Sequence, residues 1–318
     1  MKLLFAFLRL VRSLNLLFIA ITQVLFYYCI VLPAFRESGN LPAQHGILFW
    51  LLVLSSIFVA AAGYIINDYF DLSIDQVNKP SRIVVEKVLR RRSAIIWHWV
   101  LSFLGILVGL YAGWKLGLHV WIGIANLICV IFLWFYSTTF KKKLLIGNII
   151  ISLLVAWVVL VIVFAESPAL WKVANRPPGL RLDKLLRLTF LYTGFAFVIS
   201  LIREVVKDLE DMAGDARYGC KTMPIVWGVL VTKVFVATWL IVLLGALAII
   251  EIYVLQFPWW WPALYCFLLI ILPLLYIFKK LFPAVDTTSF SKLSGWIKFV
   301  MFTGILSMVF FRIYAFQV

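Results

Sequence analysis

Charged residues, acids, cysteines and histidines are all scarce in this chain. Of its 318 residues only 14% are charged, and 14 Asp and Glu stand against 29 Lys and Arg. Such low charge with 64% hydrophobic residues excludes an ordinary soluble domain. The four cysteines show neither metal-ligand nor disulfide spacing, and the three histidines are isolated. A disulfide framework and a metal site built from Cys or His are therefore excluded.

Apolar runs of about twenty residues recur along the whole chain instead, as bilayer-spanning helices require. We predict an all-α polytopic membrane protein with one transmembrane domain over residues 1–318. A β-barrel would need short alternating segments and is excluded. The first run is too long for a signal peptide and lacks a cleavage site, so we interpret it as a retained helix. The nine predicted spans lie at about 14–35, 46–66, 94–113, 117–137, 145–165, 188–207, 226–250, 259–280 and 294–315.

The distribution of Lys and Arg predicts the orientation of these spans. With the N-terminus inside, the inner segments hold more than twice as many basic residues as the outer ones. The loop at 166–187 is basic on the outer side and runs against this trend. We expect a protein of the cell inner or plasma membrane.

Two aspartate clusters about 140 residues apart are the most informative feature of the chain. Asp68, Asp71 and Asp75 follow the second span, and Asp208, Asp211 and Asp215 follow the sixth. Both clusters then face the cytoplasm. Because the second and sixth spans are four helices apart, this placement predicts two parallel four-helix halves with a ninth helix appended. The ends of the two helices would face each other across a central cavity.

The spacing of each cluster places its acids on one helical face. Steps of three and four residues return to the same side of a helix, and Gly214 is expected to end the sixth helix before Asp215. Carboxylates at helix C-termini near a membrane are disfavoured by the macrodipole, by burial and by mutual repulsion. Bound cations would stabilise them, and ligands that are all oxygen favour Mg²⁺. The alternative is that the acids only pair with nearby Lys and Arg.

Basic residues beside the clusters suit an anionic diphosphate, whose charge they would neutralise. Arg203 and Lys207 precede Asp208 on the sixth span, and Arg82 follows the first cluster. Tyr136 ends the fourth span, with Lys141 five residues later. Positive loops also set topology in most membrane proteins, which is our preferred interpretation of Arg90, Arg91, Arg92, Lys142 and Lys143.

These motifs resemble those of the UbiA superfamily of intramembrane prenyltransferases. The chain matches its first motif, N-D-x-x-D-x-x-x-D, at Asn67 to Asp75, and its second motif at Asp208 to Asp215. Tyr136 with Lys141 resembles another family feature, and Arg12 with Asn15 a weaker one. With the nine predicted helices, the resemblance covers essentially the whole chain.

The resemblance implies an active site shared by the two motifs. Mg²⁺ would be bound by Asp68, Asp71, Asp75, Asp208, Asp211 and Asp215, with Asp71, Asp75, Asp208, Asp211 and Tyr136 as the catalytic residues. The diphosphate would be bound by Asn67, Arg82, Lys141, Arg203 and Lys207. An isoprenyl diphosphate would lose its diphosphate, and a lipophilic acceptor would attack the resulting allylic cation. The expected partners are this donor, this acceptor and the lipid bilayer, and no nucleic acid.

The amino-acid sequences of both motifs are most similar to those of enzymes that add a second geranylgeranyl chain to geranylgeranylglyceryl phosphate. One segment departs from the family, which commonly continues R-P-I-x-S-G where this chain reads Arg82-Ile83-Val84-Val85-Glu86-Lys87. An aromatic acceptor, as in quinone, tocopherol or chlorophyll pathways, is therefore an open alternative. A cation-coupled transporter is a further alternative, although transport sites usually lie near the bilayer midplane. The oligomeric state is left open.

Overall fold

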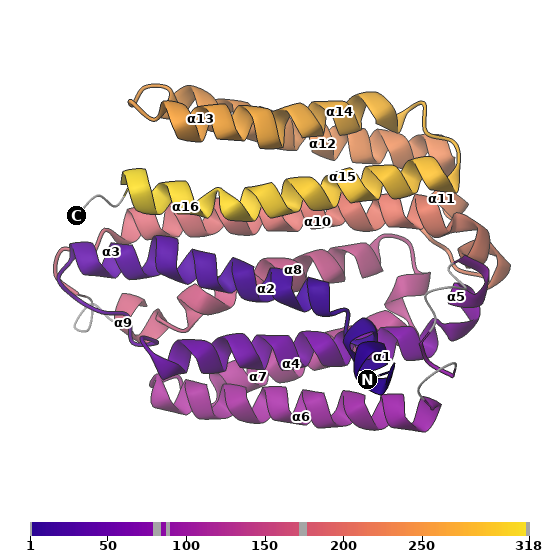
Figure 1. Ribbon diagram of the computed structural model, residues 1–318, viewed down its shortest axis with the longest axis horizontal. Helices are drawn as coiled ribbons and strands as arrows, with labels where there is room; N and C mark the ends of the chain where they lie inside the picture. The colour runs from indigo at the N-terminus through magenta and orange to yellow at the C-terminus, as the bar shows by residue number, and fades with distance from the viewer. Residues whose placement is uncertain (1, 79–83, 87–89, 172–176, 316–318) are drawn as a thin grey trace. The chain divides into compact units, whose positions relative to one another are not determined.

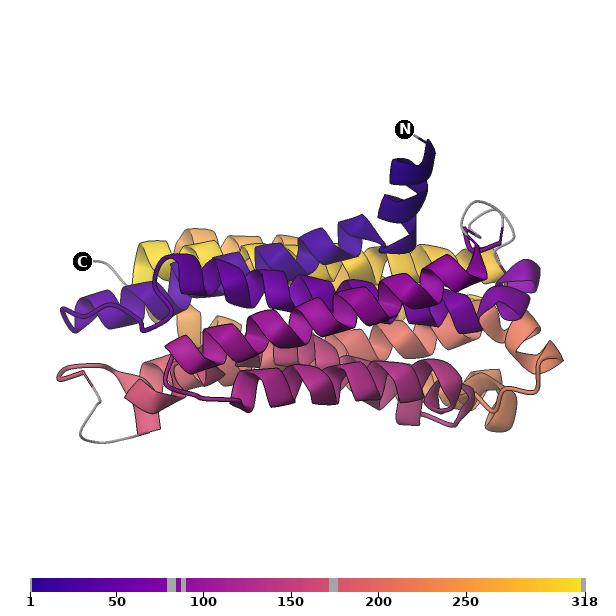
Figure 2. The ribbon, with the colours of Figure 1, turned by 90° about the horizontal axis from the view of Figure 1, so that it is seen from below.

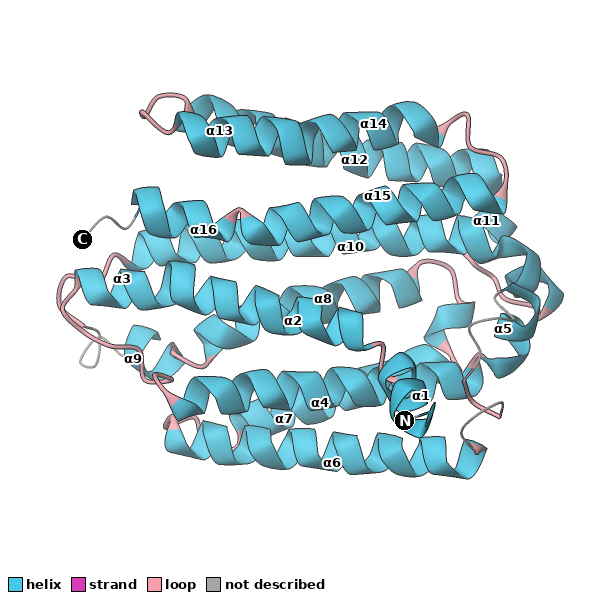
Figure 3. Ribbon diagram, viewed as in Figure 1, coloured by secondary structure: helices cyan, strands magenta, loops and turns pink. Residues whose placement is uncertain are grey.

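The computed structural model describes residues 2–78, 84–86, 90–171 and 177–315, and these residues form helices without any β-strand (Figures 1 and 3). The helices group into two compact units. Unit 1 comprises Met1–Phe140 and Trp157–Thr189, and unit 2 comprises Lys141–Ala156 and Phe190–Val318. The division falls close to the predicted boundary between two halves, although α8 and α10 contribute residues to both units. One domain over the whole chain stays a prediction.

The nine predicted spans are confirmed. Within the described ranges, nine helices or runs of helices are long and apolar enough to cross a membrane. Each overlaps one predicted span, because runs of apolar residues define these helices without any need for tertiary contacts. The spans are Ser13–Glu37, Ile47–Phe70, Arg91–Lys115, Trp121–Thr138, Ile146–Phe164, Leu182–Arg217, Gly228–Val254, Trp260–Leu281 and Thr287–Ala315.

Unit 1 contains the first four spans and the helices next to them. In chain order they are α1 (Lys2–Leu10), α2 (Ser13–Phe26), η1 (Tyr27–Val31), α3 (Leu32–Glu37), α4 (Ile47–Phe70), α5 (Leu72–Asn78), α6 (Arg91–Lys115), α7 (Trp121–Thr138), part of α8 (Ile146–Phe164) and α9 (Ser167–Trp171). Figure 2 shows that the axis of α1 makes a steep angle with the axis of α2. The turn between them is made by Arg12, a non-glycine residue in the left-handed region with φ 51°.

Helices α4, α6 and α7 pack closely because small residues line their contact (Figure 1). A Cβ atom at Gly105 would lie 2.8 Å from Val59 Cγ2, and one at Gly109 would lie 2.2 Å from Asn126 Nδ2. The buried Asn126 amide donates to Ser55 Oγ at 2.6 Å and to the Gly105 carbonyl at 3.0 Å. These contacts hold α4, and therefore the acidic motif at its end, in a fixed position within unit 1.

A buried carboxylate fastens the connection between α3 and α4. Glu166, which follows α8, is fully buried and accepts hydrogen bonds from the backbone N–H groups of Ala43 and Gln44, both at 2.9 Å. Burial raises the pKa of Glu166 above its ordinary value of 4.5, and the two amides partly oppose that rise. Protonation of this group is therefore linked to the folded state of unit 1.

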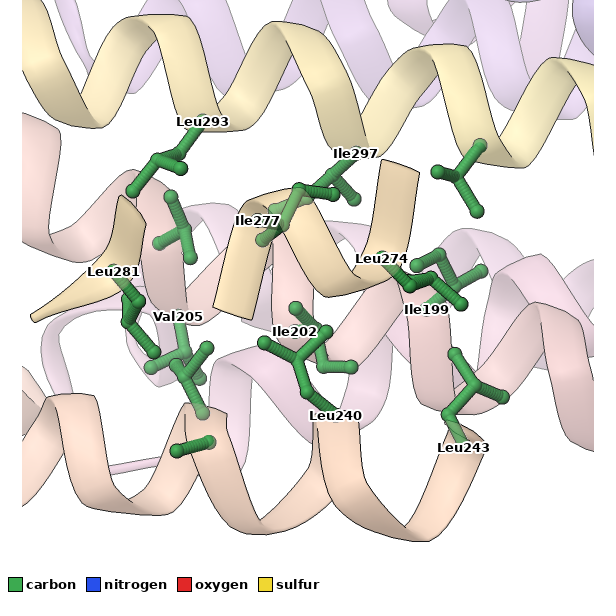
Figure 4. Close-up of a cluster of buried hydrophobic side chains, with 14 of the residues drawn as sticks. Ile199, Ile202, Val205, Leu240, Leu243, Leu274, Ile277, Leu281, Leu293 and Ile297 are labelled. Carbon is green, nitrogen blue, oxygen red and sulfur yellow. The ribbon is translucent and has the colours of Figure 1, made fainter. Parts of the chain in front are cut away.

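Unit 2 contains the remaining spans. Its elements are η2 (Phe140–Lys142, of which Phe140 belongs to unit 1), the first part of α8, most of α10 (Leu182–Arg217), α11 (Met223–Val226), α12 (Gly228–Val254), α13 (Trp260–Cys266), η4 (Phe267–Ile271), α14 (Leu272–Leu281), α15 (Thr287–Leu306), α16 (Met308–Phe310) and η5 (Phe311–Ala315). Figure 4 shows the core where α10, α12, α14 and α15 meet, with Ile202, Leu240, Leu274 and Ile297 pointing toward one another.

A buried lysine stabilises the end of α14. Lys233, on the first turns of α12, is only 6% exposed and donates from Nζ to the carbonyl oxygens of Phe282 at 2.8 Å and Ala284 at 2.5 Å. The last carbonyls of a helix have no partner within the helix, and a cation satisfies them well. The charge of Lys233 therefore has a structural role at this helix end.

Candidate active site

The first acidic motif spans the junction of α4 and α5. The helix α4 ends at Phe70, Asp71 forms the junction, and α5 begins at Leu72. The backbone bonds nevertheless continue, because Asp71 N–H donates to the Asn67 carbonyl at 2.9 Å and Asp75 N–H to the Asp71 carbonyl at 2.8 Å. The predicted single helical stripe is thus divided at Asp71. Asp75 consequently lies in the first turn of α5, where the helix dipole favours a carboxylate, rather than at a helix C-terminus.

The amide of Asn67 orients the carboxylate at this junction. Asp71 is buried, and its Oδ2 accepts a hydrogen bond of 2.7 Å from Asn67 Nδ2. The Oδ1 atom of Asn67 is itself buried and accepts no hydrogen bond from the described residues. A buried amide oxygen without a donor is a suitable ligand for a hard cation.

Asp68 forms an ion pair with Arg12. Their Nη2 and Oδ1 atoms are 2.6 Å apart, and the guanidinium also lies 5.2 Å from the ring centre of Tyr64. Burial disfavours the charge on this guanidinium, but Asp68, Tyr64 and Asp71 together outweigh burial and raise the pKa of Arg12. The sequence linked Arg12 to the site only through a weak family resemblance. The structure gives it a direct contact with a motif aspartate.

The second acidic motif lies entirely within α10. The expectation that Gly214 ends this helix is wrong, because α10 continues to Arg217 and includes Asp215, which is buried. The residue that ends the helix is Gly219, with φ 68°. Cys220 N–H donates to the Asp215 carbonyl at 2.9 Å and Gly219 N–H to the Ala216 carbonyl at 3.2 Å. This pair of bonds is the Schellman pattern, which uses glycine in the left-handed conformation.

Sequence reasoning missed Asn148, which contacts the second motif. Asn148 lies in the first turn of α8, is 8% exposed, and donates from Nδ2 to Asp208 Oδ2 at 2.9 Å. The carboxylate of Asp208 is therefore held against the N-terminal end of a helix, which favours negative charge. Asn148 and Asp208 are sixty residues apart, and no spacing rule connects them. An Asn just after a basic loop was the only signal available.

The two basic residues of α10 pair with an acid of their own helix. Arg203 Nη1 lies 2.7 Å from Glu204 Oε1, and Lys207 Nζ lies 3.3 Å from Glu204 Oε2. Glu204 is buried, and it lies one helical turn before Asp208 on α10. Its carboxylate holds both cations next to the motif, where a diphosphate would need them.

The remaining predicted site residues lie near the ends of spans. Tyr136 is in the last turn of α7, and Lys141 is in η2. The carbonyl of Lys142, next in the chain, accepts a hydrogen bond of 2.8 Å from Lys221 N–H, which ties η2 to the segment after α10. Arg82 lies outside the described residues.

The donor atoms of the motifs fit Mg²⁺ by their chemistry, since all are carboxylate or amide oxygens. Among the residues that the structure describes, no three His, Cys, Asp or Glu side chains converge into a metal site. Mg²⁺ usually takes one or two carboxylates and completes its shell with water and phosphate oxygens, so such convergence is not required. Within unit 1 the buried oxygen of Asn67 and the oriented carboxylate of Asp71 are ligands of this kind, and within unit 2 the oriented carboxylate of Asp208 is another.

Comparison with known proteins identifies the family. A sequence profile described as the UbiA prenyltransferase family matches residues 10–311. This chain belongs to the UbiA prenyltransferase family. The matched range contains both acidic motifs, Arg12 and Asn148. It confirms the family that the motifs predict.

Curated relatives share one name. The chain is 33% identical over 193 residues to the digeranylgeranylglyceryl phosphate synthase of Methanothermobacter thermautotrophicus, an alignment that covers 60% of each chain. It is 26% identical over 254 residues to that of Methanosphaera stadtmanae, covering 79% of this chain and 83% of the relative. The relative from Pyrococcus horikoshii is 32% identical over 191 residues, again covering 60% of each chain. The matched segment thus spans about three fifths of the first and third of these relatives.

Solved structures show the same fold. A structure of a digeranylgeranylglyceryl phosphate synthase in membranes has a TM-score of 0.59 at 24% identity, covering 97% of this chain and 99% of that one. A UbiA homolog from Archaeoglobus fulgidus, bound to DMAPP and Mg²⁺, has a TM-score of 0.58 at 18% identity, covering 94% and 99%. With this fold and its apolar spans, the chain is an integral membrane protein.

Proposed function

We propose that this protein is a Mg²⁺-dependent prenyltransferase that transfers a geranylgeranyl group from its diphosphate to geranylgeranylglyceryl phosphate. The observation that carries the proposal is the set of aspartates at 208, 211 and 215, all on the last turns of one membrane-spanning helix and next to two basic residues. The family and the shared name of the relatives support the reaction and the substrates.

Both motifs are assigned to the metal, as the sequence predicts. The residues proposed to bind it are Asp68, Asp71, Asp75, Asp208, Asp211 and Asp215. When bound, Mg²⁺ supplies positive charge that stabilises the departing diphosphate. The chain contributes the orientation of these ligands: Asn67 fixes the carboxylate of Asp71, and Asn148 fixes that of Asp208.

The transfer begins at the bond between C1 of the prenyl chain and the diphosphate oxygen. This bond breaks, its electron pair leaves with the diphosphate, and an allylic cation remains. The hydroxyl oxygen of the acceptor then attacks C1, and its proton passes to an oxygen of the released diphosphate. An apolar, water-poor surrounding protects the cation from hydrolysis. The membrane-spanning helices provide such surroundings.

Cationic side chains are proposed to neutralise the leaving group. Arg203 and Lys207 exchange part of their contact with Glu204 for the diphosphate oxygens. Lys141 and Arg82 keep the role that the sequence predicts, as further cations for the same anion. Tyr136 is proposed to orient the diphosphate or to face the cation with its ring. The excess of basic residues in the inner segments supports a site that faces the cytoplasm.

The experiment is transfer of labelled geranylgeranyl diphosphate by the purified full chain in nanodiscs. Asp71→Ala and Asp211→Ala are each expected to lower turnover by about 100-fold or more, since each removes charge stabilisation at the reacting centre. Asp183→Ala is the matched control, because Asp183 lies on the same helix as Asp211, in its first turn. Unchanged turnover in both test variants would refute the metal roles.

A second assay decides between the two acceptor classes. Geranylgeranylglyceryl phosphate and a phenolic acid are offered together with one C20 donor, and the product masses are measured. Preferential prenylation of the phosphate ether lipid is expected. Exclusive prenylation of the aromatic acceptor would refute the proposed substrate while leaving the reaction class intact.

A further inference from the structure

Unit 2 contains an apolar pocket that lies away from the second acidic motif. Residues of α10, α12, α13, η4, α15, α16 and η5 line it, and its cavity measures about 100 Å³. Phe195 is the last residue of α10 that lines it. Asp208 follows thirteen residues later, or about 20 Å farther along the helix axis. We name this cavity the Glu251 pocket, after the only acidic residue among its lining residues.

The size and lining of the pocket suit a single hydrocarbon chain. One water molecule needs about 10–15 Å³ of such space. The cavity therefore holds several carbons of a lipid chain but no bulky headgroup. Its walls are almost entirely aliphatic and aromatic. Cavities of that kind stay dry and bind apolar molecules. Gly304 lets α15 lie close against Phe195, because a Cβ atom there would lie 2.7 Å from Phe195 Cε1.

Two polar pairs line the pocket, and only one is available to a ligand. Tyr192 Oη and Ser307 Oγ lie 2.9 Å apart, and Ser307 Oγ also donates to the Gly304 carbonyl at 2.6 Å. This pair is satisfied within the protein. In the second pair the Cys266 thiol lies beside the Glu251 carboxyl. A thiol is a weak donor, and a carboxyl group has capacity for several further hydrogen bonds.

The surroundings of the pocket indicate that its ligand arrives from the bilayer. Ile249, Ile252 and Tyr253, on the turns of α12 around Glu251, are 70%, 65% and 58% exposed, so this surface faces hydrocarbon. Trp259 lines the pocket, and Trp260 beside it is 67% exposed. Tryptophans of this kind lie at the level of the lipid headgroups. The acidic end of the pocket therefore lies where lipid chains meet their polar heads.

We propose that the Glu251 pocket binds one chain of a membrane lipid whose hydroxyl or ammonium group donates a hydrogen bond to Glu251. An intramembrane carboxyl group is costly unless it has a partner. Among the described residues no Lys, Arg or His forms an ion pair with Glu251, so a stronger donor than the Cys266 thiol has to come from the ligand. The pocket is lined by no residue of either acidic motif, and the proposal does not depend on the proposed function.

The experiment is photolabelling of the full chain in nanodiscs with three C16 probes. Each bears a diazirine in its chain, and the heads are an alcohol, a primary amine and a carboxylate. The alcohol and the amine are expected to label residues 191–195 and 304–311, as mapped by mass spectrometry. The carboxylate should label them ~fivefold less, because like charges repel. Equal labelling by all three heads would overturn the proposal.

Variants test the two ends of the pocket separately. Glu251→Gln keeps an acceptor oxygen but loses the charge, so amine labelling should fall ~fivefold while alcohol labelling persists. Gly304→Leu displaces the ring of Phe195 and so closes the cavity, and it should abolish labelling by both probes. Gly245→Leu is its control, because no atom lies within 4 Å of a Cβ at that exposed glycine of α12.

Any one of three results would refute the proposal. These are unchanged labelling in Gly304→Leu, an unchanged ratio of amine to alcohol labelling in Glu251→Gln, and displacement of the probes by geranylgeranyl diphosphate. The last result would assign the pocket to the prenyl donor instead. If melting curves show that Gly304→Leu is misfolded, the ratio in Glu251→Gln decides alone, since it is internal to one folded sample.

Discussion

Replacement of Asn148 by leucine tests how the second acidic motif is organised. Leucine is similar in size to asparagine but cannot donate to Asp208 Oδ2, which now accepts from Asn148 Nδ2 at 2.9 Å. Asn148 is 8% exposed, so water replaces the lost donor poorly. We expect Asp208 to lose its fixed orientation while α8 and α10 keep their fold.

The expected magnitude follows from the chemistry of this bond. A hydrogen bond to a charged group contributes about 1.5–3 kcal/mol. If Asn148→Leu loses this free energy from the binding of the metal and of the transition state, its kcat/KM falls by about 10- to 100-fold. Asn148→Asp should cost more than Asn148→Leu, because it places a second negative charge against the carboxylate of Asp208.

The assay is prenyl transfer measured across a range of Mg²⁺ concentrations. In Asn148→Leu the Mg²⁺ concentration for half-maximal turnover should rise, which a purely structural role would not cause. Ser152→Ala is the control, since the Ser152 hydroxyl donates to the Asn148 carbonyl at 2.7 Å and does not touch Asp208. Wild-type turnover with an unchanged Mg²⁺ dependence in Asn148→Leu would refute the positioning role.

Three further predictions concern the stability of the fold. Lys233→Met should lower the free energy of unfolding by about 2–3 kcal/mol, because it leaves the carbonyls of Phe282 and Ala284 without their donor. The exposed Lys279→Met should change it little, and denaturation in detergent measures both. Gly219→Ala should cost about 1 kcal/mol through backbone strain alone, since nothing lies within 4 Å of its Cβ, and Gly219→Asn should recover part of that loss; equal melting temperatures for all three proteins would contradict it. Because the pKa of Glu166 is raised in the folded state, its stabilising contribution is complete below pH 4.5 and is lost as pH rises through the folded-state pKa. The wild-type protein should therefore lose stability relative to Glu166→Gln as pH rises through that range. Melting temperatures of the two proteins that change in parallel with pH would exclude the linkage.

The spans and the family were predictable because their signals are local. An apolar run of twenty residues predicts a membrane helix whatever it packs against. The motif at Asn67 to Asp75 is contained in nine consecutive residues, so its chemistry could be predicted without coordinates. The end of α10 shows the limit of this reasoning. Gly214 and Gly219 look alike in the sequence, and only the backbone conformation shows that Gly219 ends the helix.

The contacts that orient the carboxylates were decided by tertiary structure. Arg12 and Asp68 are 56 residues apart, and Asn148 and Asp208 are 60 apart. Their pairing depends on which helix ends meet, a property of packing and not of spacing. The sequence by itself therefore determined the membrane helices, the acidic motifs and the metal chemistry they favour. The tertiary structure decided which side chains hold each carboxylate, because a hydrogen bond acts only between atoms that the fold brings within about 3 Å.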